Sequence, residues 1–341
     1  MSFASTMAKL MRAESLAPDE VRAAFDAILA GEWTPVQVAG FAVALRVRGE
    51  SAETIVAAAQ AMRATMTAVE HGLAQVVDTC GTGGDGAQTL NISSAAALVV
   101  AACGYAVAKH GNRSVSSRCG SADVVESLGI PIDVPPARQA DVLREAGIAF
   151  LFAPAHHPAL KHAAQARREL GTRTIFNALG PLANPARATH QLVGVYDDAL
   201  RAIAARALGD LGVVRAWVVR GEDGLDEVSP CAPTRASILE AGQVSERTIT
   251  PEDFGIARMT PDAIAGGEAN ENAEALERIL AGAAHPARDA VILNAAAAIV
   301  VASGDAPKAC AARARDALDS GGAREVLERW RRIANAAREA G

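Results

Sequence analysis

The stretch LAQVVDTCGTGGDGAQTLNISSAAALVVAACGYAVA (residues 73–108) contains the pattern that decides the fold. The apolar run at 73–79 predicts a strand, residues 91–103 predict a helix, and YAVA at 105–108 predicts a second strand. Between the first strand and the helix lies the loop GTGGDG (81–86). Strand, helix and strand in this order predict parallel pairing, because parallel neighbours need a crossover connection.

The same alternation continues along the chain. Further strands are expected in three apolar segments, 147–152, 190–195 and 213–219. Helices are expected between and after these strands, at 122–128, 136–146, 198–211, 271–282, 286–302 and 306–335. We therefore predict an α/β fold whose mainly parallel central sheet is flanked by helices on both faces.

Residues 1–68 have a different pattern, without the alternation that is typical of strands. Pro18 marks one helix start, and Thr34 followed by Pro35 is typical of an N-cap and a first helical position. Gly49 follows an apolar-periodic segment and is expected to end a helix. This region is therefore predicted to form four short helices, a smaller all-α unit for packing or dimerisation.

The composition excludes several classes of protein. The chain has 341 residues, enough for two domains, and its net charge of −6 argues against a general nucleic-acid binder. Its five cysteines are scattered and never spaced C-x-x-C, so neither a disulfide framework nor a zinc site is expected, and the cytoplasm is the predicted location. The most apolar segment, 95–108, is interrupted by Gly104 and is too short to cross a membrane.

The loop at 81–86 resembles two known anion-binding patterns and fits neither fully. A P-loop requires Lys and then Ser or Thr after its last glycine, whereas Ala87 and Gln88 follow here. A dinucleotide-binding loop requires a carboxylate about 20 residues later, whereas the next strand ends in Lys109 and His110. A variant of that loop for NADP stays open.

A phosphate-binding loop is the interpretation that remains. Asn91 is placed to cap the following helix, and Ser93 and Ser94 lie in its first turn beside unpaired N–H groups. Such a helix N-terminus favours phosphate oxygens. The second strand leads into KHGNRSVSSRCGSAD (109–123), where basic side chains and hydroxyls also suit a phosphate. The alternatives are an ordinary capped helix and a solvated basic loop.

An acidic pair, Asp226 and Glu227, follows a later strand in GLDEVSP (224–230). Opposite a phosphate site these residues suit Mg²⁺, which commonly takes one or two carboxylates together with substrate phosphates; alone they would be a solvated loop. Because ligands bind beyond the carboxyl ends of parallel strands, all three polar loops are expected to form one site. His157 and His162 are expected to line a channel and not to bind a metal, because a spacing of five does not stack side chains on a helix face.

Taken together, these motifs closely resemble the anthranilate phosphoribosyltransferase family over nearly the whole chain. The resemblance rests on GTGGDG, NISS, KHGNRxxSSxxGSAD, RRELGTRTIFNALGPLANP (167–185), GLDE and GGEAxxNAxxxxxIL (266–280). It implies transfer of the phosphoribosyl group of 5-phosphoribosyl-1-pyrophosphate (PRPP) to anthranilate in tryptophan biosynthesis, with no nucleic-acid or membrane partner. It also implies a helical unit of residues 1–70 that forms a homodimer and is joined by a helical insertion around 165–188, and an α/β unit of residues 71–341 that binds the donor.

The resemblance also implies roles for individual residues. Two Mg²⁺ ions would be held by Ser93, Asp226 and Glu227. Anthranilate would lie against Gly81, His110, Asn112 and Arg167. The donor would be bound by a larger set from the glycine-rich and basic loops: Gly81, Gly84, Asp85, Thr89, Asn91, Ile92, Ser93, Ser94, Lys109, His110, Gly111, Asn112, Arg113, Ser114, Val115, Ser116, Ser117 and Ser121.

No obligatory catalytic acid, base or nucleophile is expected. The aniline nitrogen is unprotonated at neutral pH, so positioning and electrostatic stabilisation of the leaving pyrophosphate carry the reaction. The alternatives are a pyrimidine nucleoside phosphorylase, which has no need of the acidic pair, a noncatalytic nucleotide- or nucleic-acid-binding relative, and an enzyme for another aromatic amine. The chain departs from the family's usual residues at Ser94 and Cys119 and, near the acceptor channel, at His156, Gln165 and Ala166.

Overall fold

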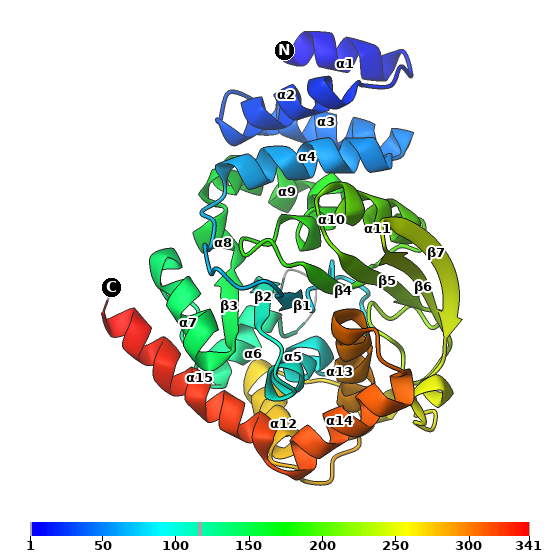
Figure 1. Cartoon of the computed structure of the whole chain (residues 1–341). Helices are drawn as coiled ribbons and strands as arrows, with labels where there is room; N and C mark the ends of the chain where they lie inside the picture. Colours follow the sequence, from blue (N-terminus) through cyan, green and yellow to red (C-terminus); the bar gives the residue numbers. More distant parts are fainter. Residues whose placement is uncertain (1, 115–117, 341) are drawn as a thin grey trace.

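The computed structural model describes residues 2–114 and 118–340. Its centre is one seven-stranded sheet, with a group of N-terminal helices at one end of the molecule (Figure 1). In chain order the strands are β1 (Val77–Asp78), β2 (Val107–Gly111), β3 (Ile148–Phe152), β4 (His190–Gly194), β5 (Arg215–Gly221), β6 (Thr234–Glu240) and β7 (Gln243–Ile249). Their order across the sheet is β3-β2-β1-β4-β5-β6-β7.

The first five strands are parallel, as the alternating pattern predicted. β1 is shorter than the predicted strand at 73–79. The hairpin of β6 and β7, which is antiparallel and pairs with β5, was not predicted. Its two-residue turn is Ala241-Gly242, and both residues have the positive φ (49° and 73°) that such hairpins require. A glycine-containing two-residue turn between two runs of strand-forming residues was the available signal.

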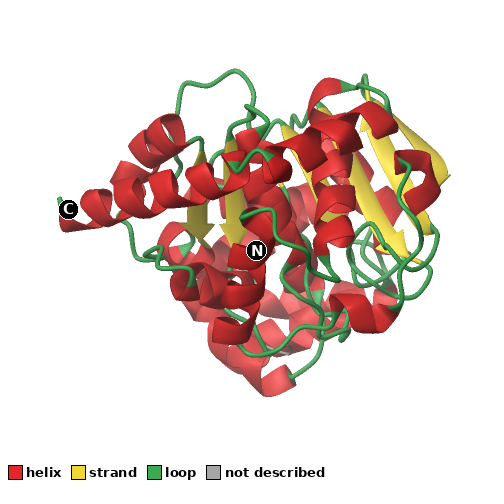
Figure 2. Cartoon of the chain, turned by 90° about the horizontal axis from the view of Figure 1, so that it is seen from below, coloured by secondary structure: helices red, strands yellow, loops and turns green. Residues whose placement is uncertain are grey.

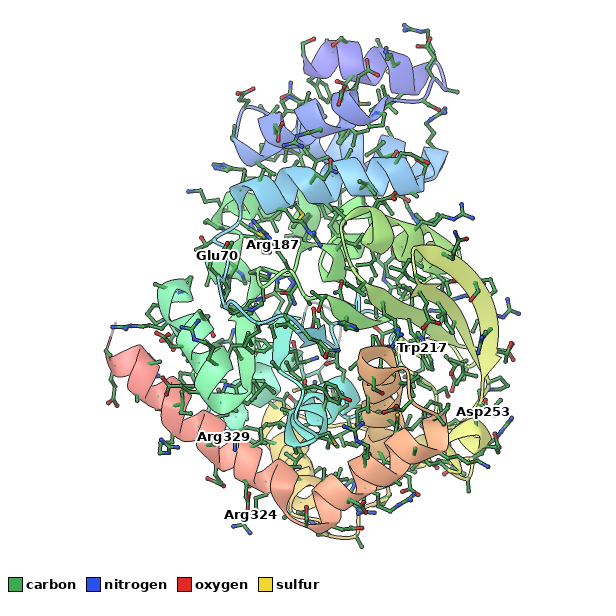
Figure 3. All side chains as sticks on the ribbon, viewed as in Figure 1. Glu70, Arg187, Trp217, Asp253, Arg324 and Arg329 are labelled. Atoms are coloured by element: carbon green, nitrogen blue, oxygen red, sulfur yellow. The ribbon has the colours of Figure 1, made fainter. Side chains whose placement is uncertain are left out.

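The sheet separates two hydrophobic cores, because alternate residues of a strand face opposite sides. Leu192 of β4 and Trp217 of β5, which is labelled in Figure 3, belong to the core that contains α5 (Ile92–Ala102) and α13 (Arg288–Ser303). The neighbouring residues Val193 and Val218 belong to the core that contains α11 (Leu200–Asp210). Figure 2 shows helices on both sides of the strands, as predicted.

The remaining helices of the first core are α6 (Ser121–Ser127), α7 (Gln139–Ala146), α12 (Ala269–Leu280), α14 (Pro307–Asp319) and α15 (Gly322–Glu339). The single helix predicted at 306–335 is therefore wrong. The chain turns at Gly321, whose φ of 80° is incompatible with a continuous right-handed helix. No helix in residues 2–114 and 118–340 is long and apolar enough to span a membrane.

The N-terminal region forms the four predicted helices, α1 (Phe3–Met11), α2 (Pro18–Leu29), α3 (Pro35–Arg48) and α4 (Ala52–Thr65), at the top of Figure 1. The predicted cap is present, since the Thr34 side chain accepts the Gln37 N–H at 3.4 Å. Two later helices, α9 (Lys161–Leu170) and α10 (Ile175–Ala178), pack against α2 and α3. The core of these helices is continuous with α11 and one face of the sheet.

Candidate active site

β1 and β4 are neighbours in the sheet, but the chain continues from them in opposite directions. β1 is followed by β2 on one side, and β4 is followed by β5 on the other. In open α/β sheets, ligands bind outside the carboxyl ends of the strands at such a point. The glycine loop (residues 81–86) follows β1, and the acidic loop (residues 224–230) follows β5.

Backbone contacts hold these loops together. The Thr82 N–H donates to the Gly194 carbonyl at 2.8 Å, and the Tyr196 N–H donates to Thr82 Oγ1 at 3.1 Å. A β-carbon on Gly194 would overlap the carbonyl of Asp226, and one on Gly81 would lie only 3.0 Å from the Gly194 carbonyl oxygen. Glycine at both positions therefore allows the glycine loop, the end of β4 and the acidic loop to touch.

Asn91 occupies the N-cap position of α5, but its side chain makes no capping hydrogen bond. Its amide donates to the Cys119 carbonyl at 3.3 Å, and its oxygen accepts from Asn272 at 2.9 Å. The prediction that Asn91 caps the helix through its side chain is therefore wrong, because tertiary partners engage it. The Ser93 N–H, predicted to be unpaired, donates to Glu227 Oε1 at 3.1 Å. The helix terminus thus already binds an anionic group, a carboxylate of the same chain.

Three carboxylates converge beside this helix terminus. Asp226 donates its N–H to Asp85 Oδ2 at 3.3 Å, and Glu227 contacts Ser93. Burial raises the pKa of Glu227 to about 7. Burial, followed by the charges of Asp85 and Glu227, raises the pKa of Asp226 well above its usual range. The acidic residues are therefore held where an added cation would be favourable.

The donor set at this point fits Mg²⁺ in one particular way. It consists of carboxylate and hydroxyl oxygens, the ligands that Mg²⁺ prefers. In the described ranges, 2–114 and 118–340, no group of three or more His, Cys, Asp and Glu side chains is arranged to hold a metal by itself. Mg²⁺ at Asp226 and Glu227 would therefore need oxygens of a bound substrate, as is common for magnesium with phosphates.

Lys109 extends from β2 toward the same point. It is 3 % exposed, and its Nζ donates to the Thr79 carbonyl at 3.2 Å and to Ser93 Oγ at 3.3 Å. Its charge lowers the pKa of Glu227, against the larger opposing effect of burial. The structure thus brings together the predicted residues of the glycine loop, the α5 terminus, β2 and the acidic loop.

The His110 imidazole lies next to Lys109 along β2 and is almost completely buried. Its Nδ1 is 2.9 Å from the Gly180 carbonyl, so Nδ1 carries the proton and Nε2 is a bare acceptor. Nε2 has no hydrogen-bond partner among the described residues. Burial, followed by the nearby His157, lowers the pKa of His110 to about 3, so the ring is neutral at physiological pH. The His110 and His157 rings are 5.2 Å apart.

His162 does not join these rings. A β-carbon on Gly31 would lie 2.7 Å from His162 Nδ1, so this histidine packs against the loop after α2. His162 therefore contacts a different segment from His157, whose ring lies beside His110, and the role of these histidines in lining a channel stays a prediction.

The basic loop after β2 is described only in part. The predicted donor ligands Val115, Ser116 and Ser117 lie outside the described residues. Arg113 forms ion pairs with Asp123 at 2.7 Å and with Glu126 at 2.9 Å, so acids of α6 neutralise its charge.

The close turn in this loop depends on two glycines. The Ser121 hydroxyl donates to the Asn112 carbonyl at 3.3 Å, and the Ser114 N–H donates to Asp123 at 3.3 Å. A β-carbon on Gly111 would overlap Ser121, and one on Gly120 would overlap the Ser114 backbone.

The other predicted donor ligands lie around the glycine loop. Thr89 forms an isolated bridge with Ala265. Ile92 is completely buried in the core, so its backbone would have to make any contact with a ligand. The Ser94 hydroxyl is buried without a hydrogen-bond partner in the part of the chain that the structure describes. A β-carbon on Gly84 would lie 2.9 Å from a guanidinium nitrogen of Arg173.

Arg167, the predicted ligand of the anthranilate carboxylate, comes from α9 and not from the sheet edge. Its guanidinium carbon is 5.7 Å from the centroid of the Phe176 ring. Burial alone lowers the pKa of Arg167, so no carboxylate of the described residues offsets the cost of burying this charge. A half-buried guanidinium without a carboxylate partner favours an anionic ligand.

Several residues that surround the site were not predicted. Arg173 stacks over the Tyr196 ring at 4.5 Å and contacts Gly84, and Asp78 and Asn184 are buried beside His110. Arg173 and Asn184 lie within the motif at 167–185, which was quoted without assigning them roles. Asp78 at the end of an apolar strand was the available signal, because a carboxylate there faces burial.

Comparisons with known proteins agree with this arrangement. The family model described as "Glycosyl transferase family, helical bundle domain" matches residues 4–66, and "Glycosyl transferase family, a/b domain" matches residues 73–324. The anthranilate phosphoribosyltransferase of Methylobacterium radiotolerans is 50 % identical over 337 residues, covering 98 % of this chain and 97 % of that protein. That of Moorella thermoacetica is 50 % identical over 323 residues, covering 94 % and 95 %.

Solved structures agree in fold. The crystal structure of anthranilate phosphoribosyltransferase from Thermus thermophilus has a TM-score of 0.92 and 42 % identity, covering 97 % of this chain and 99 % of that one. The enzyme from Saccharomyces cerevisiae in complex with PRPP and Mg has a TM-score of 0.90 and 28 % identity, covering 98 % of each chain. With matching family models, full-length relatives and the site geometry described above, the chain belongs to the anthranilate phosphoribosyltransferase family.

Proposed function

We propose that this chain transfers the phosphoribosyl group of PRPP to anthranilate, giving N-(5-phosphoribosyl)anthranilate and pyrophosphate in L-tryptophan biosynthesis. The anthranilate nitrogen forms a bond to C1 of the ribose, the C1–O bond to pyrophosphate breaks, and its electron pair leaves with the pyrophosphate. The nitrogen then releases a proton. The observation that carries the proposal is the meeting of the glycine loop, the α5 terminus and the acidic loop in a chain 50 % identical to enzymes of this name.

The donor would be bound by the residues around the α5 terminus. Lys109 offers a buried positive charge beside Ser93, and Ser94 offers an unpartnered hydroxyl. The glycine loop and the basic loop through Ser121 supply further N–H and hydroxyl donors for phosphate oxygens. Because fixed donors in a buried site cost little reorganisation, they stabilise the charge that develops on the leaving pyrophosphate.

Asp226 and Glu227, with Ser93, would hold two Mg²⁺ ions. Mg²⁺, when bound, neutralises charge on the pyrophosphate as it leaves. Asp85 accepts the Asp226 N–H and so supports the acidic loop from the glycine loop. The raised pKa of Glu227 and of Asp226 supports this role, because a site that disfavours unpaired carboxylates gains most from a cation.

Anthranilate would bind between the helical insertion and β2. Arg167 matches the planar carboxylate of anthranilate, and Gly81, His110 and Asn112 would line the path to the donor. His110 is neutral and its Nε2 is an acceptor, so it can receive a hydrogen bond from the anthranilate amine without holding a charge. A positioning role for His110 agrees with a reaction that has no obligatory general base.

The helical unit (residues 1–70) would form a homodimer through α3, and residues 71–341 would form the donor-binding unit. Val36, Val43 and Val47 of α3 are 81 %, 39 % and 84 % exposed. Their spacing places them on one side of the helix. An exposed apolar stripe of this kind suits association with a second copy.

The cytoplasmic location stays a prediction, supported by five cysteines that are all free thiols.

Light scattering tests the dimer. The parent should have twice the mass of one 35.0 kDa chain, and Val43→Glu with Val47→Glu should shift it toward the monomer. Val214→Glu is the control, because Val214 is 59 % exposed but lies between α11 and β5, away from α3. A parent that remains monomeric at all concentrations would contradict the proposed dimer.

The loss of anthranilate fluorescence tests the activity. Fluorescence should fall only when the protein, PRPP and Mg²⁺ are all present, and pyrophosphate should appear in equal amount. A reaction lacking PRPP is the control. Phosphorolysis of a pyrimidine nucleoside with no anthranilate consumption would instead favour the nucleoside phosphorylase alternative and refute the proposal.

A further inference from the structure

Asp78, at the end of β1, has no role in the function proposed above. Its side chain is completely buried. Burial raises its pKa to about 6, although Lys109 and the hydrogen-bond donors of Asn184, His110 and Cys80 act in the opposite direction. A buried carboxylate is costly unless it is well paired, so its contacts show what this group contributes.

The carboxylate of Asp78 joins three segments of the chain. Oδ1 accepts the Cys80 N–H at 3.0 Å and the His110 N–H at 3.3 Å. Oδ2 accepts from the Asn184 side-chain amide at 2.7 Å. Cys80 leads directly into Gly81 of the glycine loop, and His110 belongs to β2. One buried side chain therefore contacts both the residue that leads into the glycine loop and the strand that carries His110.

The contact with Asn184 reaches the His110 ring by a second path. Asn184 also donates to the Ala108 carbonyl of β2 at 2.8 Å, so it ties its own segment to the sheet. The segment of residues 180–184 begins at Gly180, whose carbonyl accepts the His110 Nδ1–H at 2.9 Å. Asp78 thus fixes the His110 backbone directly and orients the His110 ring through Asn184.

We propose that Asp78 is a positioning residue that sets the glycine loop and the His110 imidazole at the separation the reaction needs. This inference rests on the proposed function, in which the glycine loop binds the donor and the His110 imidazole faces the acceptor. The reaction depends mainly on the approach of the anthranilate nitrogen to the ribose C1. Such reactions are sensitive to small displacements, and a misplacement of about 1 Å can cost about a hundredfold in rate.

The main test is Asp78→Asn, which keeps the size of the side chain. Its oxygen still accepts the N–H groups of Cys80 and His110, but its amide then faces the amide of Asn184, so two donors oppose each other. We expect kcat to fall about 10- to 100-fold. Adding Asn184→Asp restores an acceptor opposite the new amide but loses the donor to the Ala108 carbonyl, so the double variant should recover only part of the lost kcat.

A second variant separates the contact of Asp78 with the glycine loop from its contact with Asn184. Asn184→Ala removes the support of the Gly180 segment but leaves the contact between Asp78 and Cys80. We therefore expect a higher KM for anthranilate with a nearly unchanged KM for PRPP, whereas Asp78→Asn should affect both substrates.

Ser237→Ala is the control. Ser237 is completely buried in β6, three strands from β1, and its hydroxyl accepts from Arg201 and donates to Glu246. Its loss removes buried hydrogen bonds away from the site, so it should lower thermal stability and leave both KM values and kcat unchanged.

The outcomes are distinct. A parent protein that fails to consume anthranilate would refute both the proposed function and this inference. An active parent with Asp78→Asn and Asn184→Ala both within twofold of its kinetic constants would overturn the inference alone. If Asp78→Asn does not fold, the KM split of Asn184→Ala decides, because a merely structural role would not raise one KM selectively.

Discussion

The substitution Glu227→Gln tests the acidic pair by its effect on stability and on metal dependence together. In the unliganded protein, Glu227 Oε1 accepts the Ser93 N–H at 3.1 Å, and a glutamine oxygen can keep that hydrogen bond. The substitution therefore removes the negative charge and little else.

The magnitude follows from the pKa. Burial raises the pKa of Glu227 from 4.5 to about 7. Between these values the folded protein binds more protons than the unfolded chain, so stability falls as the pH rises from 4.5 to 7 and stays low above it. The shift corresponds to about 3.5 kcal/mol for the ionised group, at about 1.4 kcal/mol per pKa unit. Glu227→Gln should therefore stabilise the unliganded protein by about 1–3 kcal/mol at alkaline pH and by nearly nothing at about pH 4.

Denaturant unfolding at several pH values, without Mg²⁺ or PRPP, measures this difference. The activity assay should show the opposite trend, with a much higher requirement for Mg²⁺ and a lower kcat, because the charge acts on the leaving group. Glu222→Gln is the control. Glu222 directly follows β5, the strand that leads into the acidic loop, and it is exposed and paired with Arg235 at 3.4 Å. A Glu227→Gln protein that is destabilised at alkaline pH and keeps its normal Mg²⁺ dependence would refute the reasoning.

Three further predictions concern other parts of the site. Arg167→Ala should raise the KM for anthranilate strongly and change PRPP binding little, and a collapse of PRPP binding in calorimetry would show that the arginine serves the donor instead. Gly194→Ala should cost about 1–3 kcal/mol in thermal unfolding and lower kcat, because the new β-carbon overlaps the Asp226 carbonyl; full activity would mean that the acidic loop moves without penalty. His157, whose pKa burial lowers to about 4, should destabilise the protein as the pH falls from 6.5 to 4, by up to about 1.4 kcal/mol per pH unit. His157→Gln should remove that loss. If the parent and the variant lose the same unfolding free energy between about pH 7 and about pH 5, the prediction is contradicted.

Much of the fold could be predicted from local sequence patterns. The parallel strands β2 to β5 and the helix α5 follow from short apolar runs that alternate with helical segments, and the four N-terminal helices follow from caps and periodicity. These signals are local, because a strand or a helix is specified largely by the residues within it. The edge hairpin of β6 and β7 was missed, since its second strand is exposed and polar along most of its length.

The candidate site was also largely predictable as a list of residues. Glycines, hydroxyls, a buried lysine and an acidic pair lie at the ends of parallel strands, and topology alone brings such ends to one edge of the sheet. Asn91 shows where local reasoning fails. Its N-cap position follows from the sequence, but its side chain bonds Cys119 and Asn272, residues 28 and 181 positions away along the chain.

Only the tertiary structure decides the environment of each group. The same Glu227 would be an ordinary surface acid in an open loop, and it acquires a pKa of about 7 because the glycine loop and α5 enclose it. Asp78 becomes a junction because β1, β2 and the segment before Asn184 meet around it. Hydrogen-bond partners and desolvation come from residues that are distant in sequence, so the chain order identifies the chemical groups, while their charge states and relative positions depend on how the sheet and its loops pack.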